Sequence, residues 1–197
     1  MIAPFTFNTT PSIRFGEGLL DEIGPMLAAD DHQTALIVTD AGMMATGIVD
    51  RALSSLAASG ITTGLYTDVE ADPPEAVVHA AVDAARAAGA GMIIGIGGGS
   101  SLDVAKLVAL LLPGHQTLAA AYGVGNAVGP RLPLILVPTT AVTRSEVTPI
   151  SIITTGKSEK MGVVSPVILP DIALLDPSLT LSVPPHVTAA TGIDAMV

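Results

Sequence analysis

The hydrophobic and polar positions of this chain form two kinds of pattern that alternate along most of its length. Compact apolar runs such as 92–96 are typical of strands buried in a parallel sheet, and the segments between them carry apolar residues at helical spacing. Strands are predicted at 35–38, 64–67, 92–96, 134–137 and 173–175, and helices at 19–27, 48–58, 73–89 and 102–112. The alternation predicts a Rossmann-like α/β fold, with a parallel sheet and helices on both of its faces.

Other patterns occur towards the two ends of the chain. Residues 5–7 and 12–15 alternate in the strand manner around a turn-forming segment, which predicts an N-terminal β-hairpin or a paired sheet edge. A second hairpin is predicted around Gly156, after a threonine-rich loop. A helix predicted from Pro184 is still apolar at Val197. We therefore expect an α/β domain at 1–183 and the start of a helical domain, cut within a helix, at 184–197.

Composition and charge narrow the classes of function. Although 49% of the residues are apolar, no run approaches the roughly 18 to 20 residues that would span a bilayer. The first residues lack the basic and apolar regions of a secretory signal, and the absence of cysteine excludes disulfides and thiolate metal sites. A formal charge of −10 with scattered basic residues disfavours nucleic acid. We expect a cytoplasmic protein without nucleic-acid or membrane partners.

Three polar loops follow predicted strands and should therefore share one edge of the sheet. Asp40 follows the first strand, the glycine-rich stretch 97–100 follows the third, and Thr139 and Thr140 follow the fourth. Glycines without Cβ and the free amides of a helix start suit a phosphate, although a tight turn requiring positive φ would use the same residues. The neighbouring loops favour the phosphate interpretation.

Each candidate side chain also has a structural alternative. Asp40 is placed to accept hydrogen bonds from ribose hydroxyls and to repel a 2′-phosphate, or it is simply a turn aspartate. Ser100 and Asp103 have capping-box spacing, so Asp103 is expected to cap the helix rather than catalyse, and Lys106 could pair with it. Four histidines without metal-site spacing are interpreted as surface or loop residues: His32, His79, His115 and His186.

The motifs in series resemble those of the iron-containing alcohol dehydrogenase family. The glycine loop with its helix at 97–106, the threonine loop at 138–148, the segment 160–177 and the segment 190–195 are similar to successive family signatures. The resemblance covers essentially the whole chain and implies a dehydroquinate synthase-like N-terminal nucleotide-binding domain. Val142 and Arg144 depart from the family pattern, which has glycines there. We hypothesise that Arg144 reaches an anionic group on the substrate or on the cofactor pyrophosphate.

The resemblance also implies a role for particular residues. Asp40 would bind the adenosine ribose, the glycine loop the pyrophosphate, and Asp194 would be the first ligand of a divalent iron whose histidine ligands lie beyond this chain. The residues implied to contact NAD are Asp40, Asp72, Gly98, Gly99, Ser100, Thr139, Thr140, Thr148, Lys160 and Leu179.

The implied activity is hydride transfer between NAD and the carbon of an alcohol or aldehyde, with Fe²⁺ as a Lewis acid. The chain alone is expected to bind cofactor without turnover. A homodimer is one assembly that the sequence allows. One alternative is the glycerol dehydrogenase, maleylacetate reductase or dehydroquinate synthase branch of the same fold. Others are a stand-alone nucleotide-binding or regulatory module, and an interaction domain whose cleft is empty.

Overall fold

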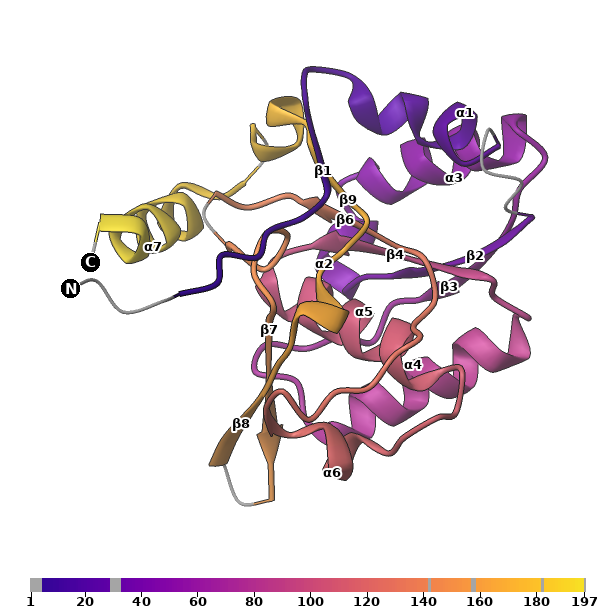
Figure 1. The fold of residues 1–197 in the computed structure, drawn as a ribbon. Helices are drawn as coiled ribbons and strands as arrows, with labels where there is room; N and C mark the ends of the chain where they lie inside the picture. The colour runs from indigo at the N-terminus through magenta and orange to yellow at the C-terminus, as the bar shows by residue number, and fades with distance from the viewer. Residues whose placement is uncertain (1–4, 29–32, 142, 157–158, 182, 197) are drawn as a thin grey trace.

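The computed structural model describes residues 5–28, 33–141, 143–156, 159–181 and 183–196. Residues 194–196 are described by their backbone alone. Its centre is a six-stranded sheet in the order β1-β9-β6-β4-β2-β3, in which every pairing is parallel (Figure 1). The strands are β1 (Ser12–Phe15), β2 (Thr34–Val38), β3 (Thr62–Tyr66), β4 (Met92–Gly97), β6 (Leu134–Pro138) and β9 (Ile172–Leu175).

Helices cover both faces of this sheet, which confirms the predicted fold class. The 3₁₀ helix η1 (Leu19–Glu22), α1 (Ile23–Ala28) and α3 (Ile48–Ala58) pack on one face, and α4 (Glu75–Ala87) and α5 (Gly99–Leu111) on the other. Strand β2 divides its side chains accordingly. Ala35 and Ile37 join the core beneath α1 and α3, whereas Leu36 and Val38 join the core beneath α4 and α5. A continuous apolar run is therefore needed, because both faces of the strand are buried.

Helix α5 is the central helix of the domain. It packs against β4 and β6 of the sheet, against α4, and against β7 (Ile150–Thr155), so that most of its residues are buried. Even Lys106, in its second turn, has no exposed surface. The helix that begins at the glycine loop is consequently held from several sides, which fixes the position of its first turn.

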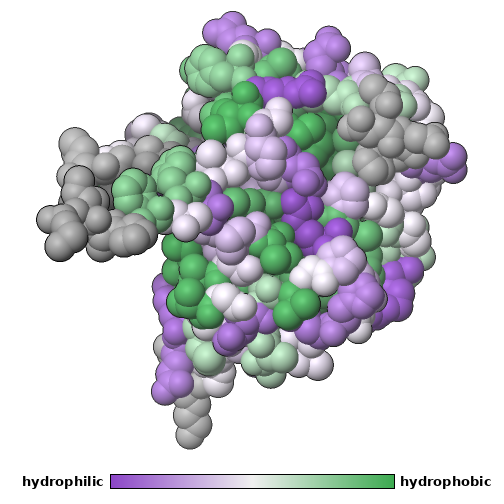
Figure 2. Space-filling view, viewed as in Figure 1, coloured by the Kyte–Doolittle hydropathy of each residue, from purple (hydrophilic) through white to green (hydrophobic). Residues whose placement is uncertain are grey.

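A second, three-stranded sheet has the order β5-β8-β7, with β5 (Gly123–Val124) and β8 (Glu159–Val164). Strands β7 and β8 pair antiparallel, which confirms the hairpin predicted after the threonine-rich loop. The C-terminal helix α7 (Pro185–Met196) begins where the apolar pattern predicts a helix and projects from the body of the molecule (Figures 1 and 2). Short helices that the pattern did not predict are α2 (Ala41–Met44), α6 (Leu118–Ala121), η2 (Pro166–Ile168) and η3 (Pro177–Thr180).

The predicted N-terminal hairpin is wrong, and its alternative, a paired sheet edge, is confirmed. Strand β1 pairs parallel with β9, in the register that sets Ser12 beside Ile172, and residues 5–11 form no strand. Thr10 is buried, and its hydroxyl donates to the backbone carbonyl of Glu146 at 2.7 Å. This long-range bond and the missing amide of Pro11 hold the segment in a path that an intramolecular hairpin turn would not follow. None of the described helices is long and apolar enough to cross a membrane.

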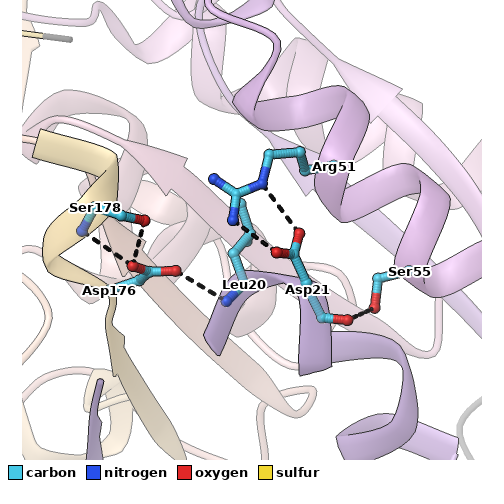
Figure 3. A network of polar contacts seen from close by, with 6 residues as sticks. All are labelled: Leu20, Asp21, Arg51, Ser55, Asp176 and Ser178. Carbon is cyan, nitrogen blue, oxygen red and sulfur yellow. Dashed lines mark hydrogen bonds and ion pairs between the residues drawn. The ribbon is translucent and has the colours of Figure 1, made fainter. Parts of the chain in front are cut away.

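A polar network joins the α1/α3 layer to the carboxyl end of β9 (Figure 3). Asp176, which is buried, accepts hydrogen bonds from the amide of Leu20 at 3.2 Å and from the amide and hydroxyl of Ser178 at 3.0 and 2.6 Å. Asp21 forms an ion pair with Arg51 at 2.8 Å. Burial acts to raise the pKa of Asp176, but the bonds from Ser178 and Leu20 outweigh it and hold the pKa below the usual 3.8.

This lowered pKa predicts an acid-sensitive contribution to stability. A carboxylate whose pKa is lowered by folding stabilises the native state fully above its unfolded pKa of 3.8, and the contribution is lost as the pH falls through the folded value. We expect Asp176→Asn to lower the free energy of unfolding at pH 7 by about 1 to 2 kcal/mol and to flatten its decline below about pH 4. Urea titrations at several pH values measure both effects. The exposed Asp50→Asn on α3 is the control, and an unchanged acid slope in Asp176→Asn would contradict the assignment.

Candidate functional site

A cavity of about 630 Å³ lies at the carboxyl ends of β2, β4 and β6. In the sheet, β2 is flanked by β3 on one side and by β4 on the other. The chain runs from β2 outward to β3 and then returns to β4, so the cavity lies where the strand order reverses. In open α/β sheets, this switch point is where ligands bind. The three polar loops predicted to share one sheet edge do so here. The cavity is lined by Asp40, Gly42, Met43, Thr46, Ile48, Val69, Glu70, Ala71, Gly98, Gly99, Ser100, Ser101, Thr139, Thr140, Leu179, Val183, Pro184 and Val187.

The glycine turn between β4 and α5 presents bare backbone to this cavity. Gly97 has a φ of 144°, which only glycine adopts readily, and a Cβ there would lie 2.9 Å from Ser101 Oγ. Gly98 is the N-cap of α5 and contributes no side-chain hydrogen bond. The first amides of the helix therefore have no capping side chain and remain available to an anion, with the positive end of the helix dipole behind them.

The predicted capping box is wrong. Because α5 begins at Gly99, Ser100 already lies in its first turn, and the Asp103 carboxylate turns away from the helix start. Its Oδ2 accepts a hydrogen bond from the amide of Ile152 at 2.9 Å, which ties α5 to strand β7. Ser100 lines the cavity instead of capping the helix.

Asp40 connects two of the three loops. It is the N-cap of α2, where its Oδ1 accepts from the amide of Met43 at 3.0 Å. Its Oδ2 accepts from the hydroxyl of Ser101, on α5, at 3.3 Å. The sequence presents a turn aspartate and a cavity residue as alternatives, and Asp40 is both. Each of its oxygens already has a donor, so the carboxylate is fixed in orientation at the cavity wall.

The threonine loop forms the opposite wall. The amide of Thr139 donates to the carbonyl of Gly97 at 3.0 Å, and its buried hydroxyl contacts Met43 Sδ at 3.4 Å. A Cβ at Gly98 would lie 3.7 Å from Thr140 Oγ1. The glycine and threonine loops therefore lie side by side. Of the predicted NAD contacts, those at the cavity are Asp40, Gly98, Gly99, Ser100, Thr139, Thr140 and Leu179.

The remaining predicted contacts do not line the cavity. Lys160, on β8, forms an exposed ion pair with Asp72 at 2.7 Å, and Asp72 has a φ of 52°. Thr148 is half-buried at the end of the threonine loop. Asp194 lies on α7, but its side chain is outside the described residues.

One of the two departures from the family's glycine pattern is visible. The exposed Arg144 has a φ of 57°, so this position of the threonine loop uses the left-handed region that favours glycine. Val142 lies outside the described residues.

The structural role of Lys106 is larger than the sequence indicates. The sequence allows Lys106 to pair with Asp103, and its Nζ lies 3.7 Å from Asp103 Oδ1. It also donates to the carbonyls of Thr148 and Ile150, at 3.0 and 2.7 Å, and thereby anchors the end of the threonine loop to α5. Burial lowers the pKa of Lys106 to about 8, against the opposing effect of the Asp103 carboxylate, and burial raises the pKa of Asp103. A lysine inside an otherwise apolar helix was the available signal.

The described part of the chain contains no group of three or more histidine, aspartate or glutamate side chains that could hold a metal ion. His79, His115 and His186 are exposed, in agreement with the surface interpretation, and His32 lies outside the described residues.

The fold and the cavity together define a doubly wound α/β domain with a ligand cleft at its switch point. The chain belongs to the iron-containing alcohol dehydrogenase family, whose family model matches residues 10–177. It is 42% identical over 192 residues to long-chain-alcohol dehydrogenase 1 of Geobacillus thermodenitrificans, covering 94% of this chain and 48% of that protein. It is 38% identical to sulfoacetaldehyde reductase of Bilophila wadsworthia, covering 98% and 50%. The chain thus spans about half the length of these relatives.

Two solved structures share the fold over nearly the whole chain. A 1,3-propanediol oxidoreductase superposes with a TM-score of 0.93 at 30% identity, covering 98% of this chain and 51% of that one. The sulfoacetaldehyde reductase of Bifidobacterium kashiwanohense in complex with NAD⁺ superposes with a TM-score of 0.90 at 33% identity, covering 98% and 52%.

Proposed function

We propose that this chain is the cofactor-binding part of an iron-dependent, NAD-linked alcohol dehydrogenase or aldehyde reductase. The observation that carries the proposal is the cavity at the switch point, where an uncapped helix start and a bare glycine turn face a fixed carboxylate. Support also comes from family membership, from a relative named NAD-dependent methanol dehydrogenase in Bacillus methanolicus, and from a similar structure that contains NAD⁺. The substrate class of the whole protein would be an alcohol or an aldehyde.

The residues present are suited to a dinucleotide. The amides at the start of α5 would hold the pyrophosphate, because they are uncapped and carry the positive end of the helix dipole. Asp40 would accept hydrogen bonds from the adenosine ribose, and the apolar wall that includes Leu179 would contact the adenine. Thr139 and Thr140 would orient the nicotinamide half across the cavity. Bound NAD supplies the hydride acceptor, and the task of this chain is to bind and orient it.

The residues present do not by themselves provide an iron site. The described residues contain no cluster of three or more potential metal ligands, and Asp194 is the single ligand that the family resemblance assigns to this chain. One carboxylate does not retain a transition metal against water. Residues 1–183 would form the cofactor domain, and 184–197 would begin a helical domain that supplies the remaining ligands. The chain alone is therefore expected to have no turnover.

Cofactor preference gives a direct test. We expect NADH to bind this chain at least about tenfold more tightly than NADPH, because a 2′-phosphate near Asp40 would place like charges together. Asp40→Ala should reduce that preference towards equality, and isothermal titration calorimetry measures both affinities. Asp50→Ala, on the outer part of α3, is the matched control and should leave the preference unchanged. Tighter binding of NADPH would overturn the role of Asp40, whereas the absence of binding to either nucleotide would overturn the proposed function.

A further inference from the structure

The cavity wall contains two carboxylates, and they differ in how their charge is compensated. Asp40 and Glu70 are the charged residues among the described cavity-lining residues, which include no lysine, arginine or histidine. Both oxygens of Asp40 accept hydrogen bonds, from the amide of Met43 and from the hydroxyl of Ser101. The side chain of Glu70 is exposed and forms no hydrogen bond or ion pair with the part of the chain that the structure describes. Its negative charge therefore faces the cavity without a partner.

The backbone on both sides of Glu70 is held in place. On one side, the amide of Val69 donates to the carbonyl of Thr39, at the end of β2, at 3.3 Å. On the other side, the amide of Thr154, on β7, donates to the carbonyl of Pro73 at 3.0 Å. Only three residues, 70–72, lie between these anchored positions. The position of Glu70 in the cavity wall is consequently fixed by the fold.

Glu70 follows Asp40 along the edge of the sheet. Strand β2 lies between β4 and β3, so the glycine turn, Asp40 and the loop that carries Glu70 succeed one another at this edge. Asp40 also forms an isolated bridge with Asp68, which brings the loops after β2 and β3 into contact. With a pyrophosphate at the glycine turn and the adenosine ribose at Asp40, the ribose would lie close to the loop that carries Glu70.

The loop after β3 has a negative field that acts on a neighbouring side chain. Burial raises the pKa of Tyr66, at the end of β3, and the charges of Asp68 and Glu70 raise it further. Lys160, on β8, balances only Asp72, with which it pairs at 2.7 Å. An unpaired charge in a binding site is a means of rejecting a like-charged competitor, in addition to any contact with the preferred ligand.

We propose that Glu70 is a second determinant of cofactor choice, which acts with Asp40 to exclude the 2′-phosphate of NADPH. This role rests on the proposed function, in which Asp40 alone rejects that group. A phosphate monoester carries a charge of about −1.5 to −2 at pH 7, so a carboxylate without a partner beside the ribose would repel it strongly. Removal of the Asp40 carboxylate should therefore leave a residual preference for NADH, and this residue of selectivity belongs to Glu70.

Calorimetry with both cofactors tests the role of Glu70. Glu70→Gln keeps the size of the side chain and removes its charge, and it should raise the affinity for NADPH at least about fivefold more than the affinity for NADH at low ionic strength. The gain should shrink at about 0.5 M salt, because exposed charges are then screened. Asp50→Asn removes an exposed carboxylate on α3, outside the cavity, and should leave the ratio of the two affinities unchanged.

Adenosine fragments locate the effect on the ligand. Adenosine 2′,5′-bisphosphate and adenosine 5′-monophosphate differ only in the 2′-phosphate and lack the nicotinamide half. Glu70→Gln should shift binding towards the bisphosphate by a factor similar to that for NADPH. Asp40→Ala/Glu70→Gln should shift it further than either single change does, because each variant removes one of the two repelling charges.

The role of Glu70 and the proposed function fail in different ways. If the parent chain binds NADH but Glu70→Gln has the parent's ratio of NADH to NADPH affinity, the role of Glu70 is wrong and the proposed function stands. An equal rise for both cofactors would also contradict the role, since the charge would then act on the dinucleotide as a whole. If neither nucleotide binds the parent chain, both proposals are overturned.

Discussion

Gly97→Ala is expected to abolish dinucleotide binding and to lower the free energy of unfolding by about 2 to 4 kcal/mol. The backbone at this position has a φ of 144°, where a Cβ is strained whatever the available space. The added carbon would also lie 2.9 Å from Ser101 Oγ and 3.3 Å from Asp40 Oδ2. Relief of either contact would break the hydrogen bond that joins these two side chains, and with it the connection between the loops after β2 and β4.

Alanine substitutions at two other glycines distinguish the effect of backbone strain on stability from the effect of a filled cavity wall on binding. At Gly98 a Cβ would have its nearest neighbour at 3.7 Å, so Gly98→Ala should leave stability nearly unchanged while it weakens NADH binding by filling the cavity wall. Gly91→Ala, with a nearest contact also at 3.7 Å but outside the cavity, should change neither. Urea denaturation and calorimetry with NADH distinguish the three variants. Native stability in Gly97→Ala would show that the turn can relax, contrary to this account.

Lys106→Met is expected to lower the free energy of unfolding by about 3 to 5 kcal/mol. The substitution removes the amine that satisfies the carbonyls of Thr148 and Ile150, and it leaves the Asp103 carboxylate buried without its nearby cation. Because these bonds anchor the threonine loop, NADH binding should weaken as well.

Lys160→Met is the matched control for this prediction. It also removes a lysine from an ion pair with an aspartate, but both partners are exposed, so the expected cost is at most about 1 kcal/mol. Asp103→Asn/Lys106→Met should be less destabilising than the sum of the single changes, since the uncompensated charge is gone. Chemical denaturation of the four variants tests the set. Equal costs for the two lysine substitutions would contradict the anchoring role of the buried Lys106.

The sheet and the cleft edge were predictable because their signals are local. Buried parallel strands require apolar runs such as the one around Ile94, and polar loops after such strands meet at one edge by geometry alone. Asp40 and Thr139 could therefore be assigned to one cavity without any contact being known.

The features that escaped prediction depend on partners distant in sequence. Ser100 and Asp103 have capping-box spacing, yet Asp103 is drawn away by Ile152, 49 residues further along the chain. Of the two alternatives for residues 5–15, the local hairpin is wrong, because the actual partner of β1 is β9, which is separated from it by nearly the whole chain. The burial of Lys106 likewise depends on β7, which packs over α5 from outside the sheet.

The cavity wall includes Val183, Pro184 and Val187, at the start of the projecting helix α7. A ligand that fills the cavity would thus contact the glycine turn on one side and the base of α7 on the other. A restraint that shifts the base of α7 would then change ligand affinity, and by reciprocity ligand binding would favour the helix position that completes the cavity wall by the same factor. Any polypeptide attached to α7 would therefore sense the nucleotide through a contact that involves no catalytic group.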